Sequence, residues 1–123
     1  MIQVQTIVKV ADNSGAKLAR VFKVLGGSKK RYARIGDIVV ASVQSAEPRK
    51  QVKKKDIVYG VVVRQKQALR RKDGSYIKFD ENTIVLINKE KKEPIAGRIF
   101  GAMPRELQEL GYQKIASLAP EVV

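Results

Sequence analysis

The 123-residue chain contains no cysteine and no histidine. Without cysteine it can form no disulfide, thiol nucleophile or thiolate metal site. Without histidine it lacks the imidazole of zinc sites and of most catalytic triads. The adjacent carboxylates Asp80 and Glu81 have no further carboxylate close by in the sequence. We therefore expect no metal site, no cofactor and no catalytic centre, and hence no enzyme.

Long apolar runs are also missing. No stretch approaches the roughly 18 apolar residues of a membrane-spanning helix. The basic stretches lack the regular apolar face of a helix that lies on a membrane surface, so we expect no membrane partner. The start, Met1-Ile2-Gln3, has the features of neither a signal peptide nor a transit peptide, and predicts a mature chain of cytosolic type.

Positive charge is abundant and unevenly distributed. Lys and Arg number 25 against 12 Asp and Glu, a net charge of +13. Residues 1–92 hold 22 basic and 8 acidic residues, whereas residues 93–123 hold 3 and 4. Length and a hydrophobic content of 44% suit one globular domain. We expect a basic part, 1–92, that faces nucleic acid, and a near-neutral tail, 93–123, that faces another partner.

The basic residues gather in three clusters, at residues 29–34, 49–55 and 64–72. A solvated basic face is the plainer interpretation, but three clusters with little acid between them favour contact with phosphates. The residues of these clusters that we predict to bind RNA are Lys29, Lys30, Arg31, Tyr32, Arg34, Arg49, Lys50, Lys53, Lys54, Lys55, Arg64, Lys66, Arg70, Arg71 and Lys72.

Seven aromatic residues are scattered along the chain, with no pair on one predicted strand face. Proteins that bind single strands stack bases on such pairs, so the pattern favours a structured RNA recognised by shape and backbone. Tyr32 alone lies inside a basic cluster, where stacking and simple packing are equally supported. The stretch 12–15, Asp-Asn-Ser-Gly, predicts a turn; Asn13 and Ser14, with Lys17 after it, are further candidates for RNA contact.

The first two-thirds of the chain favours strands. Short runs rich in Val and Ile are bounded by turn-forming residues, and Asp73-Gly74 predicts the tip of a hairpin. Such spacing without a long helical pattern predicts a small closed β-barrel. The expected strands cover residues 6–10, 18–25, 37–43, 57–63, 76–79 and 83–87.

The tail predicts two short helices. Pro104 begins the first, with Met103, Leu107 and Leu110 on one face and Gly111 at its end; residues 113–118 form the second. The tail holds more apolar residues than two short helices can bury between themselves. Part of this surface must cover the barrel, and part is expected to form a protein-binding patch ringed by the isolated charges of Arg98, Arg105 and Lys114.

Motifs along the whole chain point to a known family. Residues 60–86 contain a Gly, three aliphatic residues, a basic spacer, Asp-Gly, an aromatic residue, and then Asn82 and Val85. Further motifs are A-D-N-S-G-A at 11–16, G-G-S-K-K-R-Y-A at 26–33, G-D at 36–37, R-I-F-G at 98–101, R-E-L at 105–107 and K-I-A-S-L-A-P-E-V at 114–122. In this order the chain resembles the large-subunit ribosomal protein fourteen family, bacterial type.

The resemblance implies a mainly β fold, namely a small five-stranded β-barrel with an extended β-ribbon and a short C-terminal helical part. It implies a structural constituent of the large ribosomal subunit, in the cytoplasm or in an organelle, that binds large-subunit rRNA. Further implied partners are small-subunit rRNA at intersubunit bridges, large-subunit ribosomal proteins three and nineteen, and the ribosome silencing factor. The implied interface residues are Arg98, Phe100, Arg105 and Lys114.

The chain departs from the family pattern where interface contacts are expected, at Gly97, Ala102, Met103 and Gln108. Two alternatives to a ribosomal protein stay open on the residues alone. A free barrel that binds single strands needs an aromatic cluster on one strand face. An enzyme acting on RNA needs a metal or an acid–base set.

Overall fold

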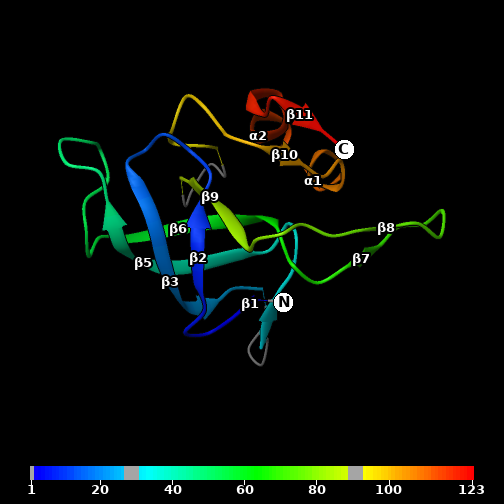
Figure 1. The fold of residues 1–123 in the computed structure, drawn as a ribbon, viewed down its shortest axis with the longest axis horizontal. Coiled ribbons are helices and arrows are strands. Elements are labelled where there is room, and N and C mark those ends of the chain that lie inside the picture. Colours follow the sequence, from blue (N-terminus) through cyan, green and yellow to red (C-terminus); the bar gives the residue numbers. More distant parts are fainter. Residues whose placement is uncertain (1, 27–30, 89–92) are drawn as a thin grey trace.

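The computed structural model describes residues 2–26, 31–88 and 93–123. Its centre is a closed five-stranded barrel (Figure 1). Neighbouring strands run antiparallel, except β2 and β9, which close the barrel in parallel with Lys9 opposite Thr83. This confirms the predicted fold class. The barrel strands are β2 (Ile7–Val10), β3 (Ala16–Val24), β5 (Ile38–Ala46), β6 (Ile57–Arg64) and β9 (Thr83–Ile87).

Strands β6 and β9 are buried on both faces. Successive residues of a strand point to opposite sides. Val62 and Ile84 therefore pack inside the barrel, while Val61 and Val85 pack in a second core outside it. Burial on both sides explains why these two strands are nearly continuous runs of Val, Ile and Leu, without the alternation of a half-exposed strand.

The tail supplies the other side of this second core. It contains β10 (Ala102–Met103), α1 (Glu106–Glu109), α2 (Gln113–Leu118) and β11 (Glu121–Val122), which lie together at the upper right of Figure 1. Part of the tail's apolar surface covers the barrel, as expected. The tail residues that pack against β6 and β9, each at most 2% exposed, are Ile99, Met103, Leu107 and Ile115.

The first helix is shorter than its apolar pattern indicates. It ends at Glu109, so Leu110 does not share the buried face of Leu107 and is 58% exposed. The prediction that Leu110 continues this face was wrong, because a helix of one turn cannot hold three positions in line. The second helix has the predicted bounds, Gln113–Leu118.

Three pairs of two-residue strands surround the barrel. Strands β7 (Leu69–Arg70) and β8 (Tyr76–Ile77) form the predicted hairpin around Asp73-Gly74, and this β-ribbon extends to the right in Figure 1. Strands β1 (Ile2–Gln3) and β4 (Tyr32–Ala33) pair antiparallel, and β10 and β11 pair in parallel. Over the described parts of the chain, neither helix has the length or the apolar character to cross a membrane.

Candidate nucleic-acid interface and tail surface

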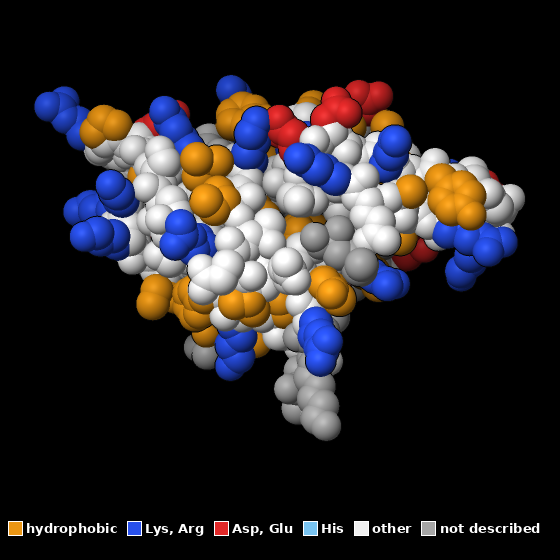
Figure 2. Space-filling view, turned by 60° about the horizontal axis from the view of Figure 1, so that its bottom comes forward, with side chains coloured by type: hydrophobic (Ala, Val, Ile, Leu, Met, Phe, Trp, Pro, Cys, Tyr) orange, Lys and Arg blue, Asp and Glu red, His pale blue; other side chains and the backbone are white. Residues whose placement is uncertain are grey.

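The three basic clusters project from different sides of the barrel, although Arg34 of the first cluster and Leu69 at the base of the ribbon line the same hollow. Tyr32 belongs to β4, which lies below the barrel in Figure 1, and Arg31 and Arg34 flank this strand. The loop 47–56 projects at one end of the molecule and the ribbon at the other (Figure 1). Figure 2 shows Lys and Arg side chains at both ends and along the upper and lower edges, with Asp and Glu side chains mainly at the upper edge. Lys29 and Lys30 lie outside the described residues.

The second cluster stands on an anchored loop. Val52 is 5% exposed and packs in the barrel core, and its N–H donates to the carbonyl of Ser14 at 3.1 Å. The Glu47 N–H donates to the Gly15 carbonyl at 2.7 Å, and the Lys53 N–H to the Asp56 carboxylate at 2.9 Å. The loop therefore holds its cations on a defined backbone. Its exposed cations are Arg49, Lys50, Lys53, Lys54 and Lys55.

The turn at 12–15 is mostly inside the protein. The Ser14 hydroxyl is buried and donates to Asp12 Oδ1 at 2.6 Å, and the Leu86 N–H donates to Asp12 Oδ2 at 3.0 Å. Burial raises the pKa of the Asp12 carboxyl, although these hydrogen bonds oppose the shift. We assign Ser14 to holding this turn, in place of the predicted RNA contact. Asn13 and Lys17 are exposed.

Arg71 connects the ribbon to the tail. Its Nε lies 2.6 Å from Glu106 Oε1, and its Nη2 donates to Glu106 Oε2 at 3.2 Å and to the backbone oxygen of Val123 at 2.6 Å. The Arg71 side chain is only 14% exposed. We therefore assign Arg71 to tail docking, although its place in a basic cluster predicted a phosphate contact.

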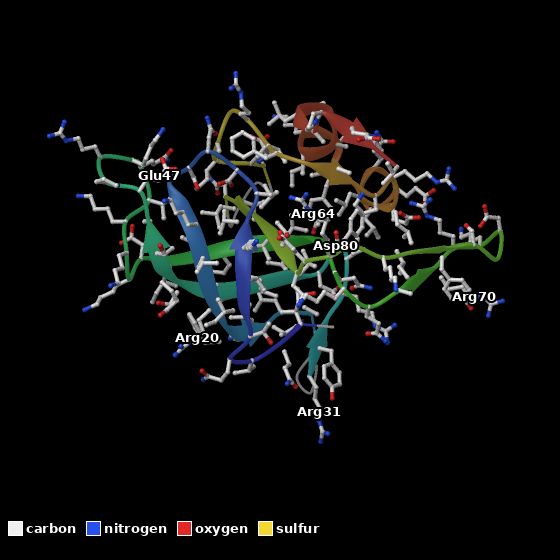
Figure 3. All side chains as sticks on the ribbon, viewed as in Figure 1. Arg20, Arg31, Glu47, Arg64, Arg70 and Asp80 are labelled. Carbon is white, nitrogen blue, oxygen red and sulfur yellow. The ribbon has the colours of Figure 1, made fainter. Side chains whose placement is uncertain are left out.

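Arg64 has a similar position at the end of β6. Its Nη2 donates to the carbonyl of Phe100 at 2.9 Å, and its Nε is buried without a hydrogen-bond partner among the described residues. Burial lowers the pKa of this guanidinium. Gly101 lies directly against it, since a Cβ there would be 2.0 Å from Arg64 Nη1. Figure 3 shows Arg64 pointing toward the tail. Arg64 too is better assigned to holding the tail than to RNA.

The remaining ribbon cations face solvent. Lys66, Arg70 and Lys72 are exposed, and Figure 3 shows Arg70 on the outer part of the ribbon. The Lys66 N–H donates to the Asn82 side-chain oxygen at 3.0 Å. This hydrogen bond joins the segment that enters the ribbon to the segment that leaves it. These three residues keep the accessibility that phosphate contact requires.

The tail surface combines exposed apolar and basic residues. Phe100 is 50% exposed, and Arg98 and Arg105 are exposed. The prediction of isolated charges was wrong for Lys114, whose Nζ lies 2.6 Å from Glu93 Oε1. Arg98 also contacts the barrel, because its backbone N–H donates to the side-chain oxygen of Asn13 at 3.2 Å. A residue predicted for RNA and one predicted for the interface are thus neighbours.

The departures from the family pattern divide between surface and core. Gly97 and Gln108 are exposed and Ala102 is half-buried, so these three can change the tail surface. Met103 is 1% exposed and packs in the second core beside Leu107. Placing the Met103 departure on the interface face was therefore wrong.

Asp80 and Glu81 are both exposed, between the β-ribbon and β9. The Glu81 carboxylate pairs with Lys9 Nζ at 2.5 Å, and this hydrogen bond holds the Glu81 pKa below its usual range. No group of three or more Asp, Glu, His or Cys residues within 2–26, 31–88 and 93–123 is placed to hold a metal ion.

The chain matches a known protein family over its full length. The family model for ribosomal protein L14p/L23e matches residues 1–123, the full chain. Such a protein is a structural, non-enzymatic component of the ribosome, and it works there in the cytoplasm. The chain therefore belongs to the ribosomal protein L14p/L23e family and is a structural constituent of the large ribosomal subunit.

Proposed function

We propose that the protein binds large-subunit rRNA through the three basic clusters and holds separate RNA segments at fixed distances. The observation that supports this is the placement of exposed cations at three ends of one closed barrel. Phosphate contacts fix the register and orientation of RNA, and a barrel is a rigid spacer between them. The proposed contacts are Asn13, Lys17, Lys29, Lys30, Arg31, Tyr32, Arg34, Arg49, Lys50, Lys53, Lys54, Lys55, Lys66, Arg70 and Lys72.

We propose other partners for the tail, residues 93–123. In the tail, Phe100 and Leu110 are exposed apolar residues, and Arg98, Arg105 and Lys114 are exposed cations. This is the composition of a protein or bridge contact more than of a phosphate cradle. With the family membership, this supports contact with small-subunit rRNA at bridges, with large-subunit ribosomal proteins three and nineteen, and with the ribosome silencing factor.

Binding to large-subunit rRNA at several salt concentrations tests the RNA proposal. Each phosphate contact to a duplex contributes about 0.9 to the slope of log affinity against log salt. K53Q/K54Q/K55Q should lower both affinity and slope. The matched control, K9Q/R20Q/K23Q, neutralises three exposed cations on the barrel wall outside the clusters and should change the slope less. Equal losses in the two triple variants, or no binding by the wild type, would contradict the proposal.

Subunit association tests the tail proposal. The double variant R98E/F100S should still comigrate with the large subunit on a sucrose gradient, because neither side chain lies in the proposed RNA clusters. It should require more magnesium for the two subunits to associate. Loss of the variant from the large subunit itself would show that these residues anchor the protein rather than face another partner.

A further inference from the structure

A solvent-open hollow of about 520 Å³ lies between the first basic cluster and the base of the ribbon. A second hollow of about 250 Å³ shares Arg34 and Leu69 with it and continues to Gln67 and Arg70. The two hollows adjoin at these shared residues, and we call them together the trough. The trough therefore joins two clusters that are separate in sequence. Figure 3 shows Arg31 below the barrel and Arg70 on the ribbon, toward its two ends. The first hollow is lined by Arg31, Tyr32, Arg34, Ile35, Asp37 and Leu69.

The trough is held in shape without a ligand. Gln65 is 2% exposed and lies between its two walls. Its Oε1 accepts from the Ile35 N–H at 3.2 Å, and its Nε2 donates to the Gln67 carbonyl at 3.0 Å. The Arg34 N–H donates to the Asp37 carboxylate at 2.7 Å, which fixes the turn beside Tyr32. These hydrogen bonds fix the backbone of the trough, so binding must order mainly the exposed Arg and Tyr side chains.

The chemistry of the lining fits an unpaired nucleotide. Tyr32 is 42% exposed and lines the hollow together with the apolar residues Ile35 and Leu69. Arginines stand along the trough where phosphates of a passing strand would lie. A base inside a regular RNA helix is stacked on both faces and cannot present a face to Tyr32, whereas a bulged or looped base can.

We propose that this trough binds an unpaired segment of RNA, with one base stacked on Tyr32 and phosphates on Arg31, Arg34 and Arg70. The inference rests on the proposed RNA-binding function and adds to it a place where the protein distinguishes an unpaired nucleotide from a helix. Of the two roles that the sequence leaves open for Tyr32, the proposal predicts stacking. A strand in the trough would contact the first and third clusters together.

Binding of two labelled RNA hairpins tests the proposal, one with a three-nucleotide bulge and one fully paired. Stacking on an aromatic ring contributes about 1–3 kcal/mol per base, so Y32L should weaken binding to the bulged hairpin about tenfold. The same change should leave the paired hairpin unaffected. Y32F retains the ring and should bind as the wild type does. The matched control is F22L, which removes another exposed ring, 41% exposed on β3 of the barrel wall and outside the clusters, and should alter neither affinity.

The outcomes separate this proposal from the general one. If the wild type binds both hairpins equally, or if Y32L lowers both affinities alike, the trough does not recognise unpaired RNA, although RNA binding itself stands. If the wild type binds neither hairpin nor rRNA, the proposed function fails as well. Circular dichroism of Y32L, matched to the wild type, excludes unfolding as the cause of a loss.

Discussion

The barrel and the tail are stabilised in different ways. The barrel strands form a continuous ring of backbone hydrogen bonds around one apolar interior. The tail has helices of 4 and 6 residues and strands of 2, too short to be stable alone. Its position depends on one apolar layer over β6 and β9 and on a few side-chain contacts from the barrel and ribbon. The tail is therefore where single substitutions should alter structure locally.

Net charge also differs between the two regions of the sequence. This difference does not mean that every basic residue of residues 1–92 faces solvent. Arg64 and Arg71 belong to the basic part of the chain, yet their guanidinium groups bind the tail at Phe100 and Glu106. A cluster of basic residues thus contains both solvent-facing cations and cations that hold the fold. Only the side-chain contacts in the structure distinguish the solvent-facing cations from the cations that hold the fold.

The largest expected effect is loss of the apolar layer under the tail. L107A removes a fully buried side chain from the second core and should lower the free energy of unfolding by about 3 kcal/mol. L110A makes the same chemical change three residues later, where the side chain is 58% exposed, and should cost less than about 1 kcal/mol. Urea unfolding measures both. Similar losses in the two variants would mean that the layer does not hold the tail.

The next effect tests whether a ribbon cation holds the tail. R71M leaves Glu106 largely enclosed without its partner and should cost about 2 kcal/mol. K114M breaks the Lys114–Glu93 pair, whose side chains are 68% and 42% exposed, and an exposed pair contributes about 0–1 kcal/mol. Added salt should reduce the stability difference between K114M and the wild type more than that between R71M and the wild type, because exposed pairs are screened. If R71M is as mild as K114M and instead weakens rRNA binding, the phosphate assignment of Arg71 should be restored.

A smaller effect concerns the contact between Arg64 and Gly101. Both Gly101 and Gly74 have positive φ, 83° and 89°, so alanine at either position costs about 1 kcal/mol in backbone strain. At Gly74 a Cβ would meet nothing within 4 Å, whereas at Gly101 it would displace the Arg64 guanidinium. G101A should therefore be less stable than G74A by about 1 kcal/mol, measured by thermal unfolding. Equal stabilities would show that Arg64 moves aside freely.

Local patterns were sufficient to predict much of this architecture. The barrel strands, the hairpin at Asp73-Gly74 and the helix Gln113–Leu118 each have a signal within a few neighbouring residues. The pairing of β1 with β4 has none, because two-residue strands show no periodicity. The tail contacts are also invisible in sequence. Arg71 is 35 residues from Glu106 and 52 from Val123, and nothing near Arg71 distinguishes it from Arg70.

The Asp12 and Asp73 carboxylates compare a buried group with an exposed one that makes the same local hydrogen bonds, although Asp12 also accepts from the Leu86 N–H. Asp12 Oδ1 accepts from the N–H and hydroxyl of Ser14 at 3.2 and 2.6 Å, and Asp73 Oδ1 accepts from those of Ser75 at 3.0 and 2.6 Å. Asp12 lies where the barrel meets the tail and is 5% exposed, whereas Asp73 is exposed at the ribbon tip.

Their pKa values should therefore move in opposite directions, and so should their effects on stability. Burial raises the pKa of Asp12, while the Ser75 hydrogen bonds lower that of Asp73. The Asp12 contribution to stability is present below its unfolded-state pKa and is lost as pH rises through its raised folded-state value. The Asp73 contribution is present above its unfolded-state pKa and is lost as pH falls through its lowered value. Carboxyl carbon chemical shifts followed by NMR against pH should show a lower titration midpoint for Asp73 than for Asp12. The reverse order would mean that hydrogen bonding outweighs burial at the junction of barrel and tail.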